Sequence, residues 1–162
     1  MSVRRLTSKI DKSVNWIKPY GTTTGSIEYR FVQKKPDYFI AYVSSHSGCK
    51  MGCQFCFLTQ QAQTSFDHVT PDEYASQIGT VVGHYQNIVF HEKERIYMSK
   101  DVNVMGLDSA YMSEFVNGHG NPYANRININ FMARGEPLAN KHVMNNWGDV
   151  SGKINGEIIK QM

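Results

Sequence analysis

The segment from Ser44 to Leu58 constrains this chain most, because it holds all three of the cysteines. Cys49, Cys53 and Cys56 lie within eight residues, and two glycines beside them let the backbone curl. Three thiols this close together are too crowded for three separate packing roles, although an isolated free cysteine ordinarily behaves as a small buried hydrophobe. The spacing therefore predicts a loop folded around a shared ligand, and it favours a metal centre.

Thiol chemistry leaves several kinds of site open. A disulfide would use two of the cysteines and leave an odd thiol, in a chain without signs of secretion. Structural zinc is normally four-coordinate, so it would need a fourth ligand such as His46 or His68. A [4Fe-4S] cluster held by three thiolates would keep one iron open for a substrate or cofactor.

The pattern Cys-x-x-x-Cys-x-x-Cys, with the aromatic residue Phe55 just before the third cysteine, resembles the signature of radical S-adenosylmethionine (SAM) enzymes. The resemblance implies that Cys49, Cys53 and Cys56 hold a [4Fe-4S] cluster, and that Phe55 lines the site of SAM. It also implies a reductant protein, whose electron lets the cluster cleave SAM to a 5'-deoxyadenosyl radical. In such enzymes the cofactors carry the hard chemistry.

Segments on both sides of the cysteines narrow the resemblance. Val43-Ser-Ser-His-Ser-Gly leads into the first cysteine, Val69-Thr-Pro-Asp-Glu-Tyr follows the loop, and Met132-Ala-Arg-Gly-Glu-Pro-Leu-Ala-Asn140 comes much later. In this order they are similar to the radical SAM methyltransferases that modify carbon 2 of an adenine in large-subunit rRNA and in tRNA. The similarity extends over about residues 27–145, and it implies an RNA substrate.

The resemblance also implies roles for residues outside the loop. In radical SAM enzymes the comparable Gly-Glu-Pro segment binds the methionine amino group of SAM, which makes Gly135 and Glu136 candidate cofactor-binding residues. Gly135 permits close backbone approach, and Pro137 stiffens the turn. A glutamate in the strand before the loop contacts the substrate adenine in the resembled family, so Glu28 is the candidate catalytic residue. An exposed strand carboxylate is the alternative role for Glu28.

Two departures limit what the resemblance implies. The rRNA methyltransferases use a methyl-carrying cysteine near the C-terminus and a resolving cysteine before the loop. Here all three cysteines are assigned to the cluster, and Tyr42 stands at the resolving position. The chain also offers about two strand–helix units, fewer than the partial barrel of the superfamily. We therefore expect a second polypeptide to complete the site, with a zinc-binding nucleic-acid module and an inactive remnant as alternatives.

Periodicity and resemblance together predict an α/β fold, an incomplete radical SAM (β/α) barrel with an N-terminal helix and a β-hairpin. Apolar residues at steps of three and four from Val3 to Ile17 predict a basic amphipathic helix. β-Branched and aromatic residues predict strands at Ile27–Val32 and Tyr38–Val43, joined by a turn. The second strand should deliver the chain into the cysteine loop.

Two strand–helix units are expected to follow. Thr70 and Pro71 are typical of a helix start, and the helix should run to about Tyr85. A strand at Ile127–Met132 and a helix near Lys141–Trp147 form the second predicted unit. In a β/α barrel the chemistry lies at the carboxyl ends of the strands, where both motifs would fall.

The prediction divides the chain at residue 37, into an N-terminal helix and hairpin strand (1–37) and a truncated radical SAM domain (38–162). Residues 87–126 are longer than a simple crossover requires, so they are interpreted as an insertion. Within it the pattern allows a short strand at Ile96–Met98 and a helix at Asp108–Val116. The insertion could contact a substrate or partner, or form an inert excursion.

Composition sets the outer bounds. A chain of 162 residues, 41% hydrophobic and 19% charged, is typical of a single soluble domain. No apolar run approaches the ~20 residues that a bilayer requires, and free thiols without a secretory signal favour the cytoplasm. Residues 1–50 carry nine Lys or Arg against three Asp or Glu. This basic third could hold an RNA backbone or could form an ordinary solvated face.

Overall fold

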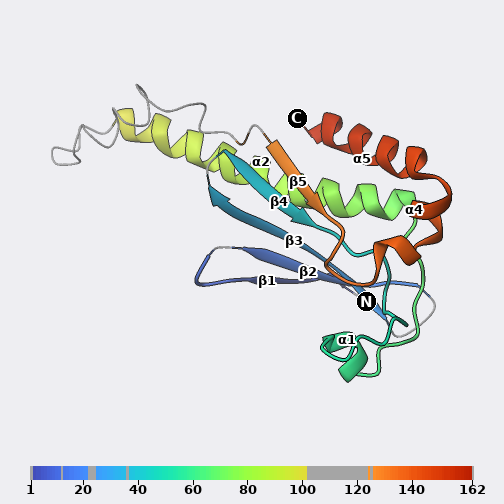
Figure 1. The fold of residues 1–162 in the computed structure, drawn as a ribbon. Helices are drawn as coiled ribbons and strands as arrows, with labels where there is room; N and C mark the ends of the chain where they lie inside the picture. Colours follow the sequence, from blue (N-terminus) through green and yellow to red (C-terminus); the bar gives the residue numbers. More distant parts are fainter. Residues whose placement is uncertain are drawn as a thin grey trace.

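The computed structural model describes residues 2–11, 13–21, 25–35, 37–101, 124 and 126–161. Within these ranges five strands form one sheet in the order β1-β2-β3-β4-β5, and the sheet stays open (Figure 1). The strands are β1 (Arg4–Thr7), β2 (Val14–Pro19), β3 (Ser26–Lys35), β4 (Tyr38–Tyr42) and β5 (Arg126–Asn130). The first four pair antiparallel, whereas β5 runs parallel to β4.

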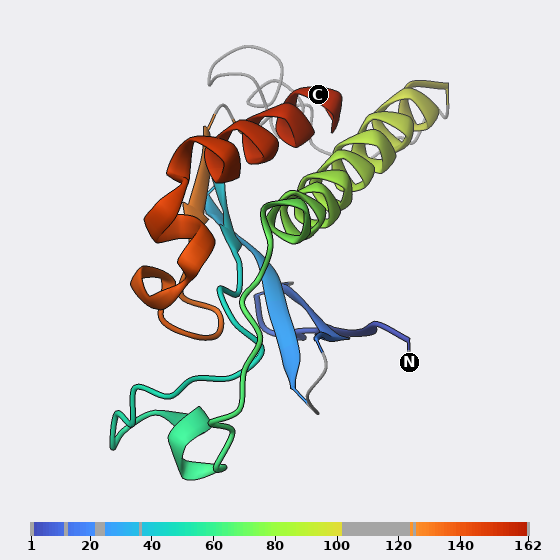
Figure 2. The same cartoon turned by 90° about the vertical axis from the view of Figure 1, so that its right-hand side faces the viewer.

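Two long helices cover one face of the sheet, and shorter ones connect the elements. The helices are α1 (Phe57–Gln60), α2 (Pro71–Asp101), the 3-10 helix η1 (Pro137–Ala139), α4 (Lys141–Asn145) and α5 (Trp147–Gln161). α2 and α5 pack side by side, and both contribute to the core beneath them (Figure 2). Because β4, α2 and β5 follow one another and the two strands are parallel, they form a strand–helix–strand unit.

Alternation along the strands builds the core between the sheet and α2. Phe31 and Phe39 lie on neighbouring strands with ring centroids 5.5 Å apart, and Phe39 stacks on Tyr85 of α2 at 4.7 Å. Burial of each large apolar side chain contributes about 1.5–3 kcal/mol. The fully enclosed part of this core is Val14, Ile27, Phe39, Ala41, Val43, Val69, Tyr74, Ile78, Val81, Val82 and Val150.

The predicted N-terminal helix is wrong, because this segment forms β1 and β2. A turn separates the two strands: the Ser8 hydroxyl accepts hydrogen bonds from the backbone of Ile10 and Asp11, and Asp11 accepts one from Ser13. Such local side-chain bonds compete with a helix. Ile10, which the helical pattern needed on its apolar face, is 97% exposed.

Other sequence predictions hold at the level of element and type. Both predicted hairpin strands exist, β5 lies within one residue of its predicted start, and α2 begins at Pro71. The helix continues to Asp101, so the predicted strand at Ile96–Met98 is wrong and the first part of the 87–126 segment is helical. The predicted helix at Asp108–Val116 lies outside the described residues. The predicted helix near Lys141–Trp147 corresponds to α4, and the longer helix α5 that follows it was not predicted.

The structure therefore confirms a mixed α/β fold, in which the described strands do not close into a barrel. No helix in the described part of the chain is long and apolar enough to cross a membrane.

Candidate functional site

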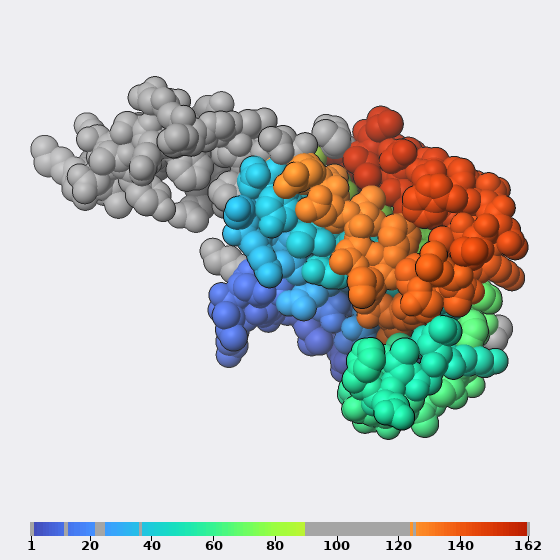
Figure 3. Space-filling model, viewed as in Figure 1, coloured from blue at the N-terminus to red at the C-terminus, as the bar shows by residue number. Residues whose placement is uncertain are grey.

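The cysteine loop leaves the carboxyl end of β4 and returns to the start of α2, and it protrudes beyond the end of the sheet (Figures 1 and 3). Its base is a neck, defined as residues 44–49 and 63–69. Across this neck the Ser47 amide donates to the Asp67 carbonyl at 3.2 Å, and the Cys49 amide donates to the Gln63 carbonyl at 3.0 Å. The neck is thus a hydrogen-bonded structure in its own right.

Glycine makes this close pairing possible at Gly48. A Cβ atom at that position would lie 2.8 Å from the Gln63 carbonyl oxygen and would also collide with the carbonyl of Ser65. Only glycine lets the two segments of the neck approach so closely.

Cys49 lies at the end of the neck, and Cys53 and Cys56 lie on the tip of the loop beyond it. Cys49 and Cys56 are half-buried, Cys53 is exposed, and Phe55 is 89% exposed. The Cys56 amide donates to the Cys53 carbonyl at 3.0 Å, and Cys56 is the residue that precedes the short helix α1. Among the described residues, no group of three or more His, Cys, Asp or Glu side chains is close enough to hold a metal ion. The fold gathers the thiols on one loop without bringing them together.

The Gly-Glu-Pro turn after β5 packs directly against the neck. The carbonyl of Arg134 accepts the Ser45 amide at 2.8 Å, and Gly135 has a φ of +86°. A Cβ atom on Gly135 would lie 2.7 Å from Nδ1 of His46 and 2.8 Å from Oγ of Ser45. The structure thus brings two of the sequence-predicted segments together at the carboxyl ends of two adjacent parallel strands. The carboxylate of Glu136 accepts the Leu138 amide at 3.1 Å and so caps η1.

An arginine that sequence reasoning overlooked connects these parts. The Arg134 guanidinium donates to Oε1 of Glu28 at 2.8 Å, to Oε1 of Gln63 at 2.7 Å and to the Ser47 carbonyl at 3.4 Å. Its side chain is 8% exposed. The candidate catalytic residue Glu28 is therefore an ion-pair partner of Arg134, and its backbone is held on both sides by the Ser44 hydroxyl. A charged residue directly after an apolar strand was the available signal.

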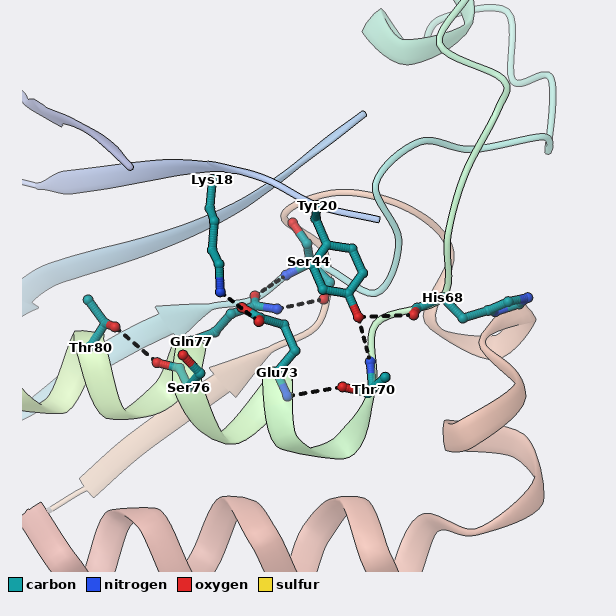
Figure 4. Close-up of polar contacts among 9 residues, drawn as sticks. All are labelled: Lys18, Tyr20, Ser44, His68, Thr70, Glu73, Ser76, Gln77 and Thr80. Atoms are coloured by element: carbon teal, nitrogen blue, oxygen red, sulfur yellow. Dashed lines mark hydrogen bonds and ion pairs between the residues drawn. The ribbon is translucent and has the colours of Figure 1, made fainter. Parts of the chain in front are cut away.

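Two fully buried amides fix the base of the loop. Nδ2 of Asn140 donates to the carbonyls of Ser45 at 2.7 Å and Val69 at 3.0 Å, while its oxygen caps α4. Gln77 of α2 accepts the Ser44 amide at 2.8 Å and donates to the Ser44 carbonyl at 3.3 Å (Figure 4). Each amide satisfies buried backbone groups that would otherwise lack partners. Neither residue was a predicted site residue, although Asn140 ends one of the quoted motifs.

The return of the chain to α2 is held by a second group of contacts. The Thr70 hydroxyl accepts the Glu73 amide at 3.3 Å, as expected of a helix cap. The Tyr20 hydroxyl bridges the carbonyl of His68 and the amide of Thr70, and Lys18 forms a 2.7 Å ion pair with Glu73 (Figure 4). These contacts tie the end of β2 to the end of the cysteine loop.

Two histidines face each other inside the neck. Nε2 of His46 lies 3.0 Å from Nδ1 of His68, which also accepts the Lys141 amide at 3.3 Å. Nδ1 of His68 is thus an acceptor, so Nε2 of His46 supplies the proton. Burial, followed by the like charge of His68, lowers the pKa of His46 to about 4, and burial also lowers the pKa of His68. Both imidazoles are neutral at neutral pH.

Fold and site together define an α/β protein with a three-cysteine loop at the carboxyl end of a parallel strand pair. Comparisons of the chain with protein-family models, with curated proteins and with solved structures found no match.

Proposed function

We propose that this protein is a radical SAM protein, which binds a [4Fe-4S] cluster through Cys49, Cys53 and Cys56 and cleaves SAM. The observation that carries the proposal is the contact between the neck of the cysteine loop and the Gly135 turn. Two segments that are about ninety residues apart in the sequence meet at the end of the sheet where strand–helix folds gather their functional residues. A zinc site on the loop alone would not require this contact.

The donor set fits such a cluster, since three free thiols lie on one loop. The tip has to rearrange to gather them, and Gly52, with a φ of +66° and nothing within 4 Å of its Cβ direction, can accommodate this. Metal binding is coupled to the ordering of its ligands, so binding of the cluster would supply the free energy for this rearrangement. The neck, with its own hydrogen bonds, would remain in place while the tip closes.

The residues around the loop have distinct proposed roles. When bound, the cluster would supply the electron that cleaves SAM to a 5'-deoxyadenosyl radical. Gly135 and Glu136 would bind the methionine end of SAM, and Phe55, exposed on the tip, would cover it. The protrusion of the loop leaves Cys53 accessible to a reductant protein.

The proposed substrate is a single-stranded part of an rRNA or tRNA. Phe39 and Ala41 of β4 point into the core, so Tyr38 and Tyr42 lie on the sheet face opposite the helices. Asn130 of β5 is paired with Tyr42, and Arg126 stacks over Tyr38 at 5.1 Å. Aromatic rings beside amide and guanidinium groups are the means by which sheets bind unpaired bases.

Adenine methylation would need more than this chain provides. All three cysteines are assigned to the cluster, so a second polypeptide would supply the methyl-carrying cysteine. Glu28 would contact the adenine while it remains paired with Arg134, since its side chain stays 28% exposed. We further infer a cytoplasmic location, because reduced thiols persist there.

Anaerobic reconstitution with iron and sulfide tests the proposal. We expect a brown protein with about four irons per chain, because the cluster type requires that number. Addition of a strong reductant and SAM should release 5'-deoxyadenosine. Substitution of any one of the three cysteines by Ala should abolish the colour. Met51→Ala is the matched control, since Met51 is an exposed residue of the same tip.

A colourless protein that carries only zinc would contradict the cluster and favour a zinc-binding module. A full cluster that releases no 5'-deoxyadenosine would contradict SAM cleavage and favour an inactive remnant.

A further inference from the structure

We propose that Arg134 is a positioning residue, which holds the neck of the cysteine loop at a set distance from the Gly135–Glu136 turn. The inference rests on the proposed function, because it concerns a cofactor that would bridge these two segments. Arg134 itself would touch neither the cluster nor SAM.

Arg134 contacts both segments of the neck, one through its backbone carbonyl and the other through its side chain. Its carbonyl accepts the amide of Ser45 at 2.8 Å and the hydroxyl of Ser45 at 3.2 Å, on the segment that enters the loop. Its guanidinium donates to the side chain of Gln63 at 2.7 Å, on the segment that leaves the loop. The carbonyl of the same Gln63 accepts the amide of Cys49. Gln63 thus links the Arg134 guanidinium to the backbone of Cys49.

The ion pair with Glu28 connects Arg134, and through it the neck, to the sheet. A guanidinium that is 8% exposed is costly to bury unless it is paired, and the Glu28 carboxylate at 2.8 Å supplies the opposite charge. Glu28 lies in β3, where the Ser44 hydroxyl accepts its amide hydrogen bond and donates to its carbonyl. Arg134 therefore connects the turn after β5 with both β3 and the neck.

Arginine is the side chain suited to this task. Its planar fork reaches three acceptors from separate parts of the chain, Glu28, Gln63 and the Ser47 carbonyl. A lysine ammonium is a compact point charge without this fork. Lysine at position 134 would keep the charge beside Glu28 and would lose the span to Gln63.

The consequence concerns a ligand that spans both segments. The three cysteines belong to one loop, so iron uptake does not depend on the distance between the loop and the turn. SAM would be held by the loop at one end and by Gly135 and Glu136 at the other. A misplacement of about 1 Å in such a site can lower the reaction rate about 100-fold.

Two variants test the inference on the reconstituted chain, Arg134→Lys and Gln63→Ala. Both should hold iron in the wild-type amount and bind SAM about 3- to 30-fold more weakly, the range typical of residues that influence a site without touching its ligand. SAM affinity is measured by equilibrium dialysis, and independently by the SAM concentration that changes the electron paramagnetic resonance spectrum of the reduced cluster. Lys153→Gln is the control, since it breaks the 2.7 Å ion pair between α5 and Asp72 of α2. It should leave SAM binding unchanged.

SAM affinity within about twofold of wild type in both variants would overturn the positioning role. Loss of iron together with loss of SAM would also overturn it, because Arg134 would then be needed to build the loop itself. If the wild type takes up no cluster, the proposed function fails and hydrogen exchange on the metal-free chain decides the role of Arg134. Faster exchange of the Cys49 amide in both variants, and not in Lys153→Gln, supports the role of Arg134 in holding the neck in place. Unchanged exchange overturns it.

Discussion

Nε2 of His46 lies 3.0 Å from Nδ1 of His68, and this pair closes the neck of the cysteine loop. His46 is 2% exposed, and its environment lowers its pKa to about 4. The pair joins the two segments of the neck without a charge, so its stability depends on both rings staying neutral.

Acid should destabilise the metal-free protein through this pair. The unfolded chain takes up a proton near pH 6.5, whereas folded His46 resists until about pH 4. The unfolded state binds more protons between these values, so the free energy of unfolding should fall by about 2–3 kcal/mol as pH drops across them. Urea unfolding at a series of pH values measures this slope.

His46→Gln should flatten that slope, because glutamine does not titrate. Met144→Gln, at an exposed and non-titrating residue of α4, is the control and should keep the wild-type slope. An equal slope in the wild type and His46→Gln would show that other groups cause the acid sensitivity.

Glu136→Ala should weaken SAM binding more than it lowers iron content, since the cysteine loop does not include Glu136. The same change removes the cap of η1, where the carboxylate accepts the Leu138 amide at 3.1 Å. Glu136→Gln separates the two effects, because its amide oxygen can still cap the turn. Equal SAM affinity in both variants and in the wild type would remove Glu136 from the site.

Gly135→Ala should destabilise the fold by about 1–3 kcal/mol, the cost of a left-handed conformation for a residue with a Cβ. The added atom would also lie 2.7 Å from Nδ1 of His46. Gly156→Ala is the contrasting control, because α5 leaves open space there and alanine favours a helix by about 0.8–1 kcal/mol. Thermal unfolding of both variants should show opposite signs.

Asn140→Ala should cost about 2–4 kcal/mol of unfolding free energy. It leaves the buried carbonyls of Ser45 and Val69 without their donor and removes the cap of α4. Asn146→Ala is the matched control, since its side chain accepts the exposed Asp149 amide at 3.3 Å. Loss of a helix cap alone typically costs about 1 kcal/mol. A cost of about 1 kcal/mol or less for Asn140→Ala would therefore mean that water replaces the amide at the buried carbonyls.

The isolated chain should self-associate, and a complementary polypeptide should reduce this. β5 ends the described sheet, and an edge strand is a template for pairing. Exposed apolar side chains cluster in the segments that follow it: Met132, Leu138, Met144 and Trp147. Light scattering measures the association, and Met132→Glu should reduce it more than Ile159→Glu on α5. A monodisperse monomer with a stable cluster would contradict the need for a second chain.

Local sequence determined the elements whose signals lie within a few residues. The cap at Thr70 and the proline at position 71 place the start of α2, and alternation places β3 and β4. The same local chemistry places three thiols on one loop. These features depend on neighbours along the chain, so they can be predicted from the sequence without knowledge of the tertiary structure.

Tertiary structure alone decided the rest. The N-terminal segment has a helical apolar spacing, yet it forms strands because β2 can pair with β3 and bury Val14 and Trp16. The ion pair of Glu28 and Arg134 joins residues 106 positions apart. No periodicity encodes such a contact, because it exists only after β3 and β5 have joined opposite sides of β4. Burial then makes the pairing of those two charges obligatory.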